Sequence, residues 1–254
     1  MSYIIAVTGK GGVGKTTFSA LLIKNLINSG KTPVLAIDAD PNSCLDAALG
    51  QKVESTIGKA REDVRQEGAS PSISTKELLQ IKLNESLVEA NGFDLIAMGR
   101  PEGAGCYCYA NDVLKSVIGE LSGQYPYVVL DNEAGLENLS RRIVQSVDMM
   151  VLVSDASNAG LETLKRLYEL ALEMEIKFGK LTLVINRTRN QNYTAKLEEI
   201  KSQTKADFII VLPDDDEIAE FAETNRSYFE LPEENPVNKE INEFLGKVKI
   251  KDGI

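Results

Sequence analysis

The sequence predicts an α/β fold, a mostly parallel sheet of seven or eight strands with helices on both faces. Near-continuous apolar runs recur along the chain, as in strands that are covered on both sides. Helical patterns separate most of these runs, and strand–helix alternation produces a parallel sheet. A glycine-rich turn directly follows the first apolar run, at residues 9–16. The 254 residues fit a single domain, 1–254.

Each element is predicted from its pattern. The apolar runs predict strands over Ile4–Thr8, Pro33–Asp38, Phe93–Met98, Tyr127–Asp131, Met149–Ser154, Leu181–Asn186 and Phe208–Leu212. The helical patterns cover Thr16–Ser29, Thr75–Glu89, Ala110–Leu121, Leu161–Lys177, Tyr193–Thr204, Ile218–Thr224 and Pro236–Gly246. Gly30, Gly92 and Gly179 are expected to end three of these helices. The polar stretch Ala48–Ser74 is expected to form a mobile loop or short helices near the glycine-rich turn.

The glycine-rich turn matches the phosphate-binding pattern G-x-x-x-x-G-K-S/T. Its glycines let several backbone N–H groups point at one anion, and the following helix adds the positive end of its dipole. In this pattern Lys15 reaches the β- and γ-phosphates, and the Thr16 hydroxyl is placed to bind Mg²⁺. We therefore expect a P-loop NTPase domain that binds ATP or ADP with Mg²⁺ through Gly11, Gly12, Val13, Gly14, Lys15, Thr16 and Thr17.

The fourth apolar run ends on an acid, Asp131. Open α/β sheets bind their ligands outside the carboxyl ends of the strands. An aspartate at such an end is typical of the Walker B element, which holds Mg²⁺, usually through a water. Thr16 and Asp131 are therefore the predicted magnesium ligands.

The composition and charge of the chain argue against nucleic-acid and membrane partners. The net charge is −10, and no dense lysine and arginine cluster appears, so we expect no nucleic-acid partner. No apolar run approaches the roughly 20 residues that span a bilayer, and the acidic balance of the last helix disfavours membrane binding. The chain begins directly on a strand, so a cytoplasmic protein without a signal is expected. The absence of histidine excludes histidine ligands and histidine acid–base catalysis.

A second lysine, Lys10, follows the first glycine of the turn, too early to be the ordinary phosphate lysine. The run from Lys10 to Thr17 resembles the deviant Walker A motif of the MinD/ParA/nitrogenase iron protein superfamily. This resemblance implies that Lys10 reaches across a homodimer to the nucleotide of the partner subunit. A cation there would stabilise the charge on the transferring phosphoryl group. A solvent-exposed surface lysine is the alternative.

The resemblance extends to the strand ends. Asp38-Ala39-Asp40-Pro41 resembles the first switch of the superfamily, which implies that Asp40 orients the attacking water. Asp38 would then support the magnesium shell and the loop; a simple Asp-Pro turn is the alternative. Gly135 resembles the second-switch glycine, whose N–H approaches the γ-phosphate, and Glu133 beside it is given no catalytic role. The adenine would be recognised by Asn186, Arg187, Pro213 and Asp214.

Two of the three cysteines form a Cys-x-Cys pair, Cys106 and Cys108. Two thiolates can bind one soft metal ion but do not complete a tetrahedral site. A two-fold dimer would bring two pairs together and supply four sulfurs. Free thiols in a loop are the alternative, and four thiolates could also hold an iron–sulfur cluster. Cys44 is expected to be a small buried side chain.

These features together resemble the CooC-type ATPases that mature nickel-containing carbon monoxide dehydrogenase. The resemblance implies that Cys106 and Cys108 bind Ni²⁺, or Zn²⁺, at a homodimer interface formed on nucleotide or metal binding. The client would be carbon monoxide dehydrogenase, and a related factor for acetyl-CoA synthase would look similar. Two alternatives stay open: an iron–sulfur electron donor of the nitrogenase iron protein type, and a positioning ATPase of the MinD/ParA type.

Overall fold

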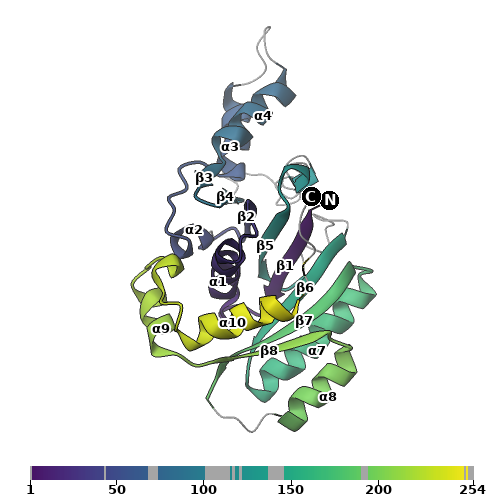
Figure 1. Ribbon diagram of the computed structural model, residues 1–254. Helices are drawn as coiled ribbons and strands as arrows, with labels where there is room; N and C mark the ends of the chain where they lie inside the picture. Colours follow the sequence, from purple (N-terminus) through teal and green to yellow (C-terminus); the bar gives the residue numbers. More distant parts are fainter. Residues whose placement is uncertain are drawn as a thin grey trace.

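The computed structural model describes residues 2–42, 44–67, 74–100, 115, 118–119, 122–136, 146–189, 194–248 and 250. It confirms the α/β fold, with an eight-stranded sheet in the order β3-β4-β2-β5-β1-β6-β7-β8 (Figure 1). The strands are β1 (Tyr3–Gly9), β2 (Val34–Ala39), β3 (Val88–Ala90), β4 (Phe93–Ala97), β5 (Tyr127–Ala134), β6 (Ser146–Asp155), β7 (Lys177–Thr188) and β8 (Phe208–Pro213). Neighbouring strands run parallel except β3 and β4, which are antiparallel.

The helices lie on both faces of this sheet. They are α1 (Lys15–Asn28), α2 (Leu45–Ala48), α3 (Ile57–Glu67), α4 (Thr75–Glu85), α7 (Asn158–Glu173), α8 (Thr194–Thr204), α9 (Asp216–Glu223) and α10 (Pro236–Lys247), with short 3-10 helices η1 (Ser122–Gln124) and η2 (Tyr228–Glu230). The predicted helix Ala110–Leu121 falls almost wholly outside the described residues.

The side chains of the strands alternate between two cores. In β1, Ile5 and Val7 pack with Phe18 of α1 and Ile241 of α10. Ala6 points to the other face, where the core includes side chains of α7 and α8. Because the central strands are covered on both faces, their sequences read as unbroken apolar runs.

The predicted helix Thr75–Glu89 ends earlier, at Glu85, and residues 88–90 form the edge strand β3. The two-residue loop Asn91-Gly92 joins β3 to β4, and Gly92 has a φ of +85°. An Asn-Gly pair is a strong signal for a tight hairpin. Gly92 therefore closes a hairpin and does not end a helix.

Two further boundaries differ from the prediction. The helix expected over Leu161–Lys177 ends at Glu173, and β7 begins at Lys177, so Gly179 lies inside a strand. Gly30 does end α1, with its N–H donating to the carbonyl of Ile27 at 2.9 Å.

The polar stretch Ala48–Ser74 contains an 11-residue helix, α3, which packs against α4 (Figure 1).

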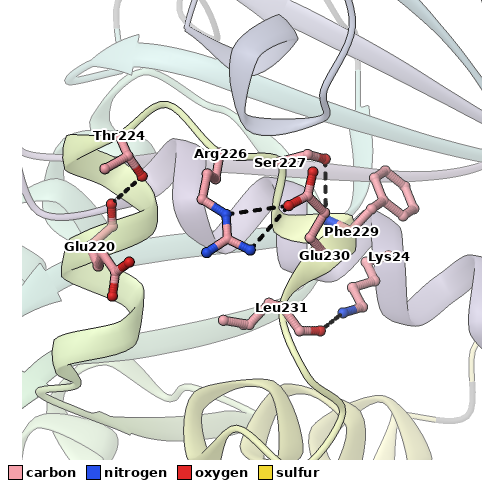
Figure 2. A network of polar contacts seen from close by, with 8 residues as sticks. All are labelled: Lys24, Glu220, Thr224, Arg226, Ser227, Phe229, Glu230 and Leu231. Carbon is pink, nitrogen blue, oxygen red and sulfur yellow. Dashed lines mark hydrogen bonds and ion pairs between the residues drawn. The ribbon is translucent and has the colours of Figure 1, made fainter.

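The segment after β8 returns over α1, as Figure 2 shows. Buried Lys24 of α1 donates to the carbonyl of Leu231, and Arg226 pairs with Glu230 at 3.1 Å. The hydroxyls of Thr17, in the first turn of α1, and Tyr228 lie 3.2 Å apart. The C-terminal segment thus fixes the helix that begins at the phosphate-binding turn.

Candidate nucleotide-binding site

The phosphate-binding turn lies between the end of β1 and the start of α1. Gly12 and Gly14 have φ values of +76° and +94°, in the left-handed region that favours glycine. A Cβ atom on Gly14 would lie 2.4 Å from the side-chain amide nitrogen of Asn186. A side chain at position 14 would therefore strain the left-handed backbone and also clash with Asn186.

An open cavity of about 530 Å³ lies over this turn and joins four parts of the chain. The turn, the segment after β2, the end of β5 and the end of β7 each contribute residues. The lining residues are Gly11, Gly12, Gly14, Lys15, Thr16, Thr17, Asp40, Asn42, Glu133, Ala134 and Arg187. Most of the predicted phosphate-binding residues and Asp40 therefore share one cavity.

The two lysines of the turn are placed differently. The side chain of Lys15 is buried, and its Nζ donates to the carbonyl of Lys10 at 3.3 Å. Lys10 is exposed. At the end of β6, the pKa of Asp155 is held below its usual value by hydrogen bonding from Ser157, with a smaller contribution from the positive charge of Lys10. Asp155 is a neighbour of Lys10 that the sequence patterns did not indicate.

Asp131 is buried at the end of β5, with 1% of its surface exposed. Burial raises the pKa of its carboxyl to about 6, and hydrogen bonds from Thr16 and Ser19 oppose this rise. The Ser19 hydroxyl donates to Asp131 at 3.0 Å. A hydroxyl and a carboxylate are hard oxygen ligands that fit Mg²⁺, and a bound cation would favour the ionised acid. Thr16 and Asp131 remain the predicted magnesium ligands.

Asp38 lies beside Asp131 in the register of β2 and β5 and is fully buried. Its carboxylate accepts hydrogen bonds from the backbone N–H groups of Asp40, at 3.0 Å, and Leu45, at 2.9 Å. Burial, followed by the charge of Asp131, raises the pKa of Asp38 to about 7. Asp38 therefore holds the loop that carries Asp40.

Gly135 is held close to β1. Its N–H donates to the carbonyl of Gly9 at 3.0 Å, and its carbonyl accepts a hydrogen bond from Thr8. In this structure the Gly135 N–H thus points at the chain itself, and an approach to the γ-phosphate would require that bond to open. Glu133 lines the phosphate cavity, a position that the sequence analysis did not predict.

A second cavity of about 240 Å³ adjoins the first, because Gly14, Thr17 and Arg187 line both. Its other lining residues include the remaining predicted adenine contacts and several apolar side chains: Phe18, Leu21, Asn186, Arg189, Leu212, Pro213, Asp214, Asp215, Ile218, Ala219, Ala222 and Val237. A cavity lined by both apolar and polar side chains beside a phosphate cavity suits a nucleotide base.

The Asn186 amide has partners within the chain. Its Nδ2 donates to the carbonyl of Val13 at 2.8 Å, and its Oδ1 accepts from the N–H of Arg187 at 3.0 Å. Asp214 pairs with Arg189 at 2.7 Å. Asn186 therefore supports the phosphate-binding turn directly, in addition to its predicted contact with adenine.

Residues 4–228 match the profile of the CobQ/CobB/MinD/ParA nucleotide binding domain, which covers most of the chain. The chain belongs to this family. An uncharacterized ATP-binding protein of Methanocaldococcus jannaschii is 44% identical over 250 residues, 96% of this chain and 98% of its own length. The carbon monoxide dehydrogenase accessory protein CooC of Rhodospirillum rubrum is 33% identical over 68% of this chain and 70% of its own length. Septum site-determining protein MinD of Bacillus subtilis is 30% identical, covering 85% and 77%.

Solved structures of the MinD/ParA type share the fold. A ParA family ATPase from Chlorobium tepidum matches with a TM-score of 0.72 and 18% identity over 96% of this chain and 97% of its own. MinD from Pyrococcus horikoshii, complexed with Mg-ADP, matches with a TM-score of 0.68 and 20% identity over 97% of each chain. The architecture is therefore that of a MinD/ParA-type nucleotide-binding domain.

The predicted soft-metal ligands of this family member, Cys106 and Cys108, lie outside the described residues. Across the part of the chain that is described, no group of three or more histidine, cysteine, aspartate or glutamate side chains could hold a metal ion. Cys44 is exposed, so the expectation of a buried side chain was wrong. No helix within the described ranges is long and apolar enough to cross a membrane.

Replacing Asn186 by alanine is expected to weaken the binding of ATP and of inorganic tripolyphosphate by similar factors, about tenfold each. The variant removes the bond to Val13, so the phosphate-binding turn loses a support that does not depend on the base. Competition titrations with both ligands measure the two factors. If only ATP binding weakens, Asn186 reads the base and does not support the turn.

Proposed function

We propose that this protein is a Mg²⁺-dependent ATPase that binds ATP across the two adjoining cavities. The observation that carries this proposal is that a partly apolar cavity of about 240 Å³ adjoins the phosphate cavity, with Gly14, Thr17 and Arg187 lining both. Relatives that are named ATP-binding proteins, and the Mg-ADP complex of a MinD with the same fold, support it.

In this proposal each residue of the site has its own role in ATP binding or hydrolysis. Lys15 neutralises the β- and γ-phosphates, and Thr16 and Asp131 hold Mg²⁺. Asp40 lines the phosphate cavity and orients the attacking water. Lys10 completes the site of a second copy of the chain, so hydrolysis takes place in a homodimer. Phosphate release per subunit should then rise with protein concentration and require Mg²⁺; a rate that does not depend on concentration contradicts the dimer.

We further propose that ATP binding serves the handling of nickel for a metalloenzyme such as carbon monoxide dehydrogenase. Two features support this role: the Cys106-x-Cys108 pair of the sequence, and the 33% identity to CooC. Two copies of the pair would supply four thiolates for one soft ion. ATP would favour the closed dimer only through contacts that it makes better in that state.

Replacing Cys106 and Cys108 by serine is expected to abolish stoichiometric binding of Ni²⁺, from one ion per two chains to none. Cys44→Ser is the matched control, because Cys44 is exposed and lies on another segment. Metal analysis with native mass spectrometry, with and without ATP, measures the stoichiometry. Nickel binding that survives the double change, or an anaerobically purified brown protein with cluster absorption, would contradict the nickel site.

A positioning ATPase of the MinD type is the second candidate, favoured by the 30% identity to MinD over 85% of the chain. Such a role needs a membrane or nucleic-acid contact. In this structure the apolar side of α10, with Ile241 and Phe244, is buried in the core and is not free to bind lipid. Co-sedimentation of the ATP-bound protein with anionic liposomes or with DNA would support this second candidate.

A further inference from the structure

A chain of hydrogen bonds connects the end of β4 to the loop that carries Asp40. The Arg100 guanidinium donates to Oδ1 of Asn42. The Nδ2 of Asn42 donates to Oδ1 of Asp40 at 3.0 Å, and the Asn42 N–H donates to the same oxygen at 2.8 Å. Asp40 and Asn42 both line the phosphate cavity.

The bond from Arg100 fixes the orientation of the side-chain amide of Asn42. A guanidinium has only donors, so it can bond the oxygen of an asparagine amide but not its nitrogen. With Oδ1 held by Arg100, the Nδ2 group must face Asp40, where it donates to the carboxylate. The reversed amide would place its oxygen against a carboxylate and its NH₂ against a cation. Arg100 therefore selects the orientation that holds Asp40.

The backbone that presents Arg100 is itself anchored. The N–H of Met98 donates to the carbonyl of Asp38 at 2.8 Å, and the carbonyl of Met98 accepts from Gly58 of α3 at 2.9 Å. Gly99 lies so close to Thr56 that a Cβ atom would come within 2.3 Å of its hydroxyl. Arg100 thus extends from a strand end that is fixed to β2, two residues before Asp40, on one side and to α3 on the other.

We propose that Arg100 is a positioning residue for ATP hydrolysis. It acts through Asn42 to hold the Asp40 carboxylate in the phosphate cavity, in line for the attacking water. This inference rests on the proposed function, in which Asp40 orients that water. Arg100 does not line the phosphate cavity, and in this role it contacts neither nucleotide nor Mg²⁺.

Replacing Arg100 by alanine is expected to lower kcat for ATP hydrolysis about tenfold and to change KM less than twofold, because a charge-assisted hydrogen bond to the positioning amide is lost. Asn42→Ala should lower kcat similarly, and the double variant should be no slower than either single one. Arg100→Lys, which keeps a cationic donor, should recover most of the rate. Arg166→Ala, at an exposed position of α7, is the control.

A second measurement does not depend on hydrolysis. In the nucleotide-free protein, Arg100→Ala should speed hydrogen exchange of the backbone N–H of Asn42 at least about fivefold. This N–H donates to Asp40, and the bond is weakened when the Asn42 side chain is no longer held by Arg100. An active wild type in which Arg100→Ala changes neither kcat nor this exchange overturns the inference alone. So does a variant in which kcat and the melting temperature fall and KM rises together. A wild type that hydrolyses no ATP overturns the proposed function, and the positioning role of Arg100 with it.

Discussion

Replacing Lys15 by alanine is expected to weaken ATP binding roughly 30- to 4,000-fold. The Lys15 side chain is buried, lines the phosphate cavity and is the lysine that the phosphate-binding pattern places at the β- and γ-phosphates. Removing one member of a desolvated charge pair costs about 2–5 kcal/mol, which is roughly a 30- to 4,000-fold loss of affinity. Calorimetric titration with Mg-ATP measures the loss.

The matched control is Lys10→Ala, since Lys10 belongs to the same turn but is exposed. This variant should bind ATP within about threefold of the wild type, because Lys10 is proposed to act on the nucleotide of a second chain. Lys15 also donates to the carbonyl of Lys10, so melting temperatures of both variants must be compared. If Lys15→Ala binds ATP as tightly as Lys10→Ala, the assignment of the phosphate lysine is wrong.

The sheet could be predicted from the sequence because its signals are local. All seven predicted strands are present, since strands that are buried on both faces must be apolar at successive positions. The phosphate-binding turn is equally local, because its glycines, lysine and threonines are consecutive. The hairpin of β3 and β4 had a local signal too, Asn91-Gly92, which the helical pattern before it concealed.

Between β2 and β3 the sequence predicted α4, as Thr75–Glu89, but not the bounds of α3, because the stability of α3 comes from tertiary packing. The sequence of α3 is mostly polar, yet Ile57 and Ala60 are fully buried. α3 begins at the end of β4, where the N–H of Gly58 bonds to Met98. Ile57, Ala60 and Val64 have helical spacing, but three apolar positions in a polar stretch are too few to predict a helix without its packing.

The hydrogen bonds that orient the residues of the candidate site could not be predicted from the sequence either. Ser19 bonds to Asp131 across 112 residues, and Asn186 bonds to Val13 across 173. Thr8 holds the carbonyl of Gly135 from a neighbouring strand. Each contact depends on strand order, which the sequence limits but does not specify. Residue types could therefore be assigned to the site, whereas the contacts that orient them required the structure.

Replacing Asp40 by asparagine is expected to leave ATP binding within about threefold of the wild type and to slow hydrolysis at least 100-fold. Orientation of water by a charged acceptor contributes about 10²- to 10⁴-fold in such sites. The side-chain oxygen of asparagine can still accept from the N–H of Asn42, so the loop should keep its conformation. The change therefore tests the charge of Asp40 and not the fold of the loop.

Single-turnover phosphate release and native mass spectrometry measure the two parts of this result. If hydrolysis opens the dimer, Asp40→Asn should stay dimeric with ATP for as long as the nucleotide persists, whereas the wild type should return to monomers. Asp46→Asn is the control, because Asp46 accepts from its neighbour Ala47 in α2 and does not line the phosphate cavity. An Asp40→Asn variant with more than about one-tenth of the wild-type rate would mean that another group orients the water. Glu133, which lines the same cavity, would then be the next residue to replace.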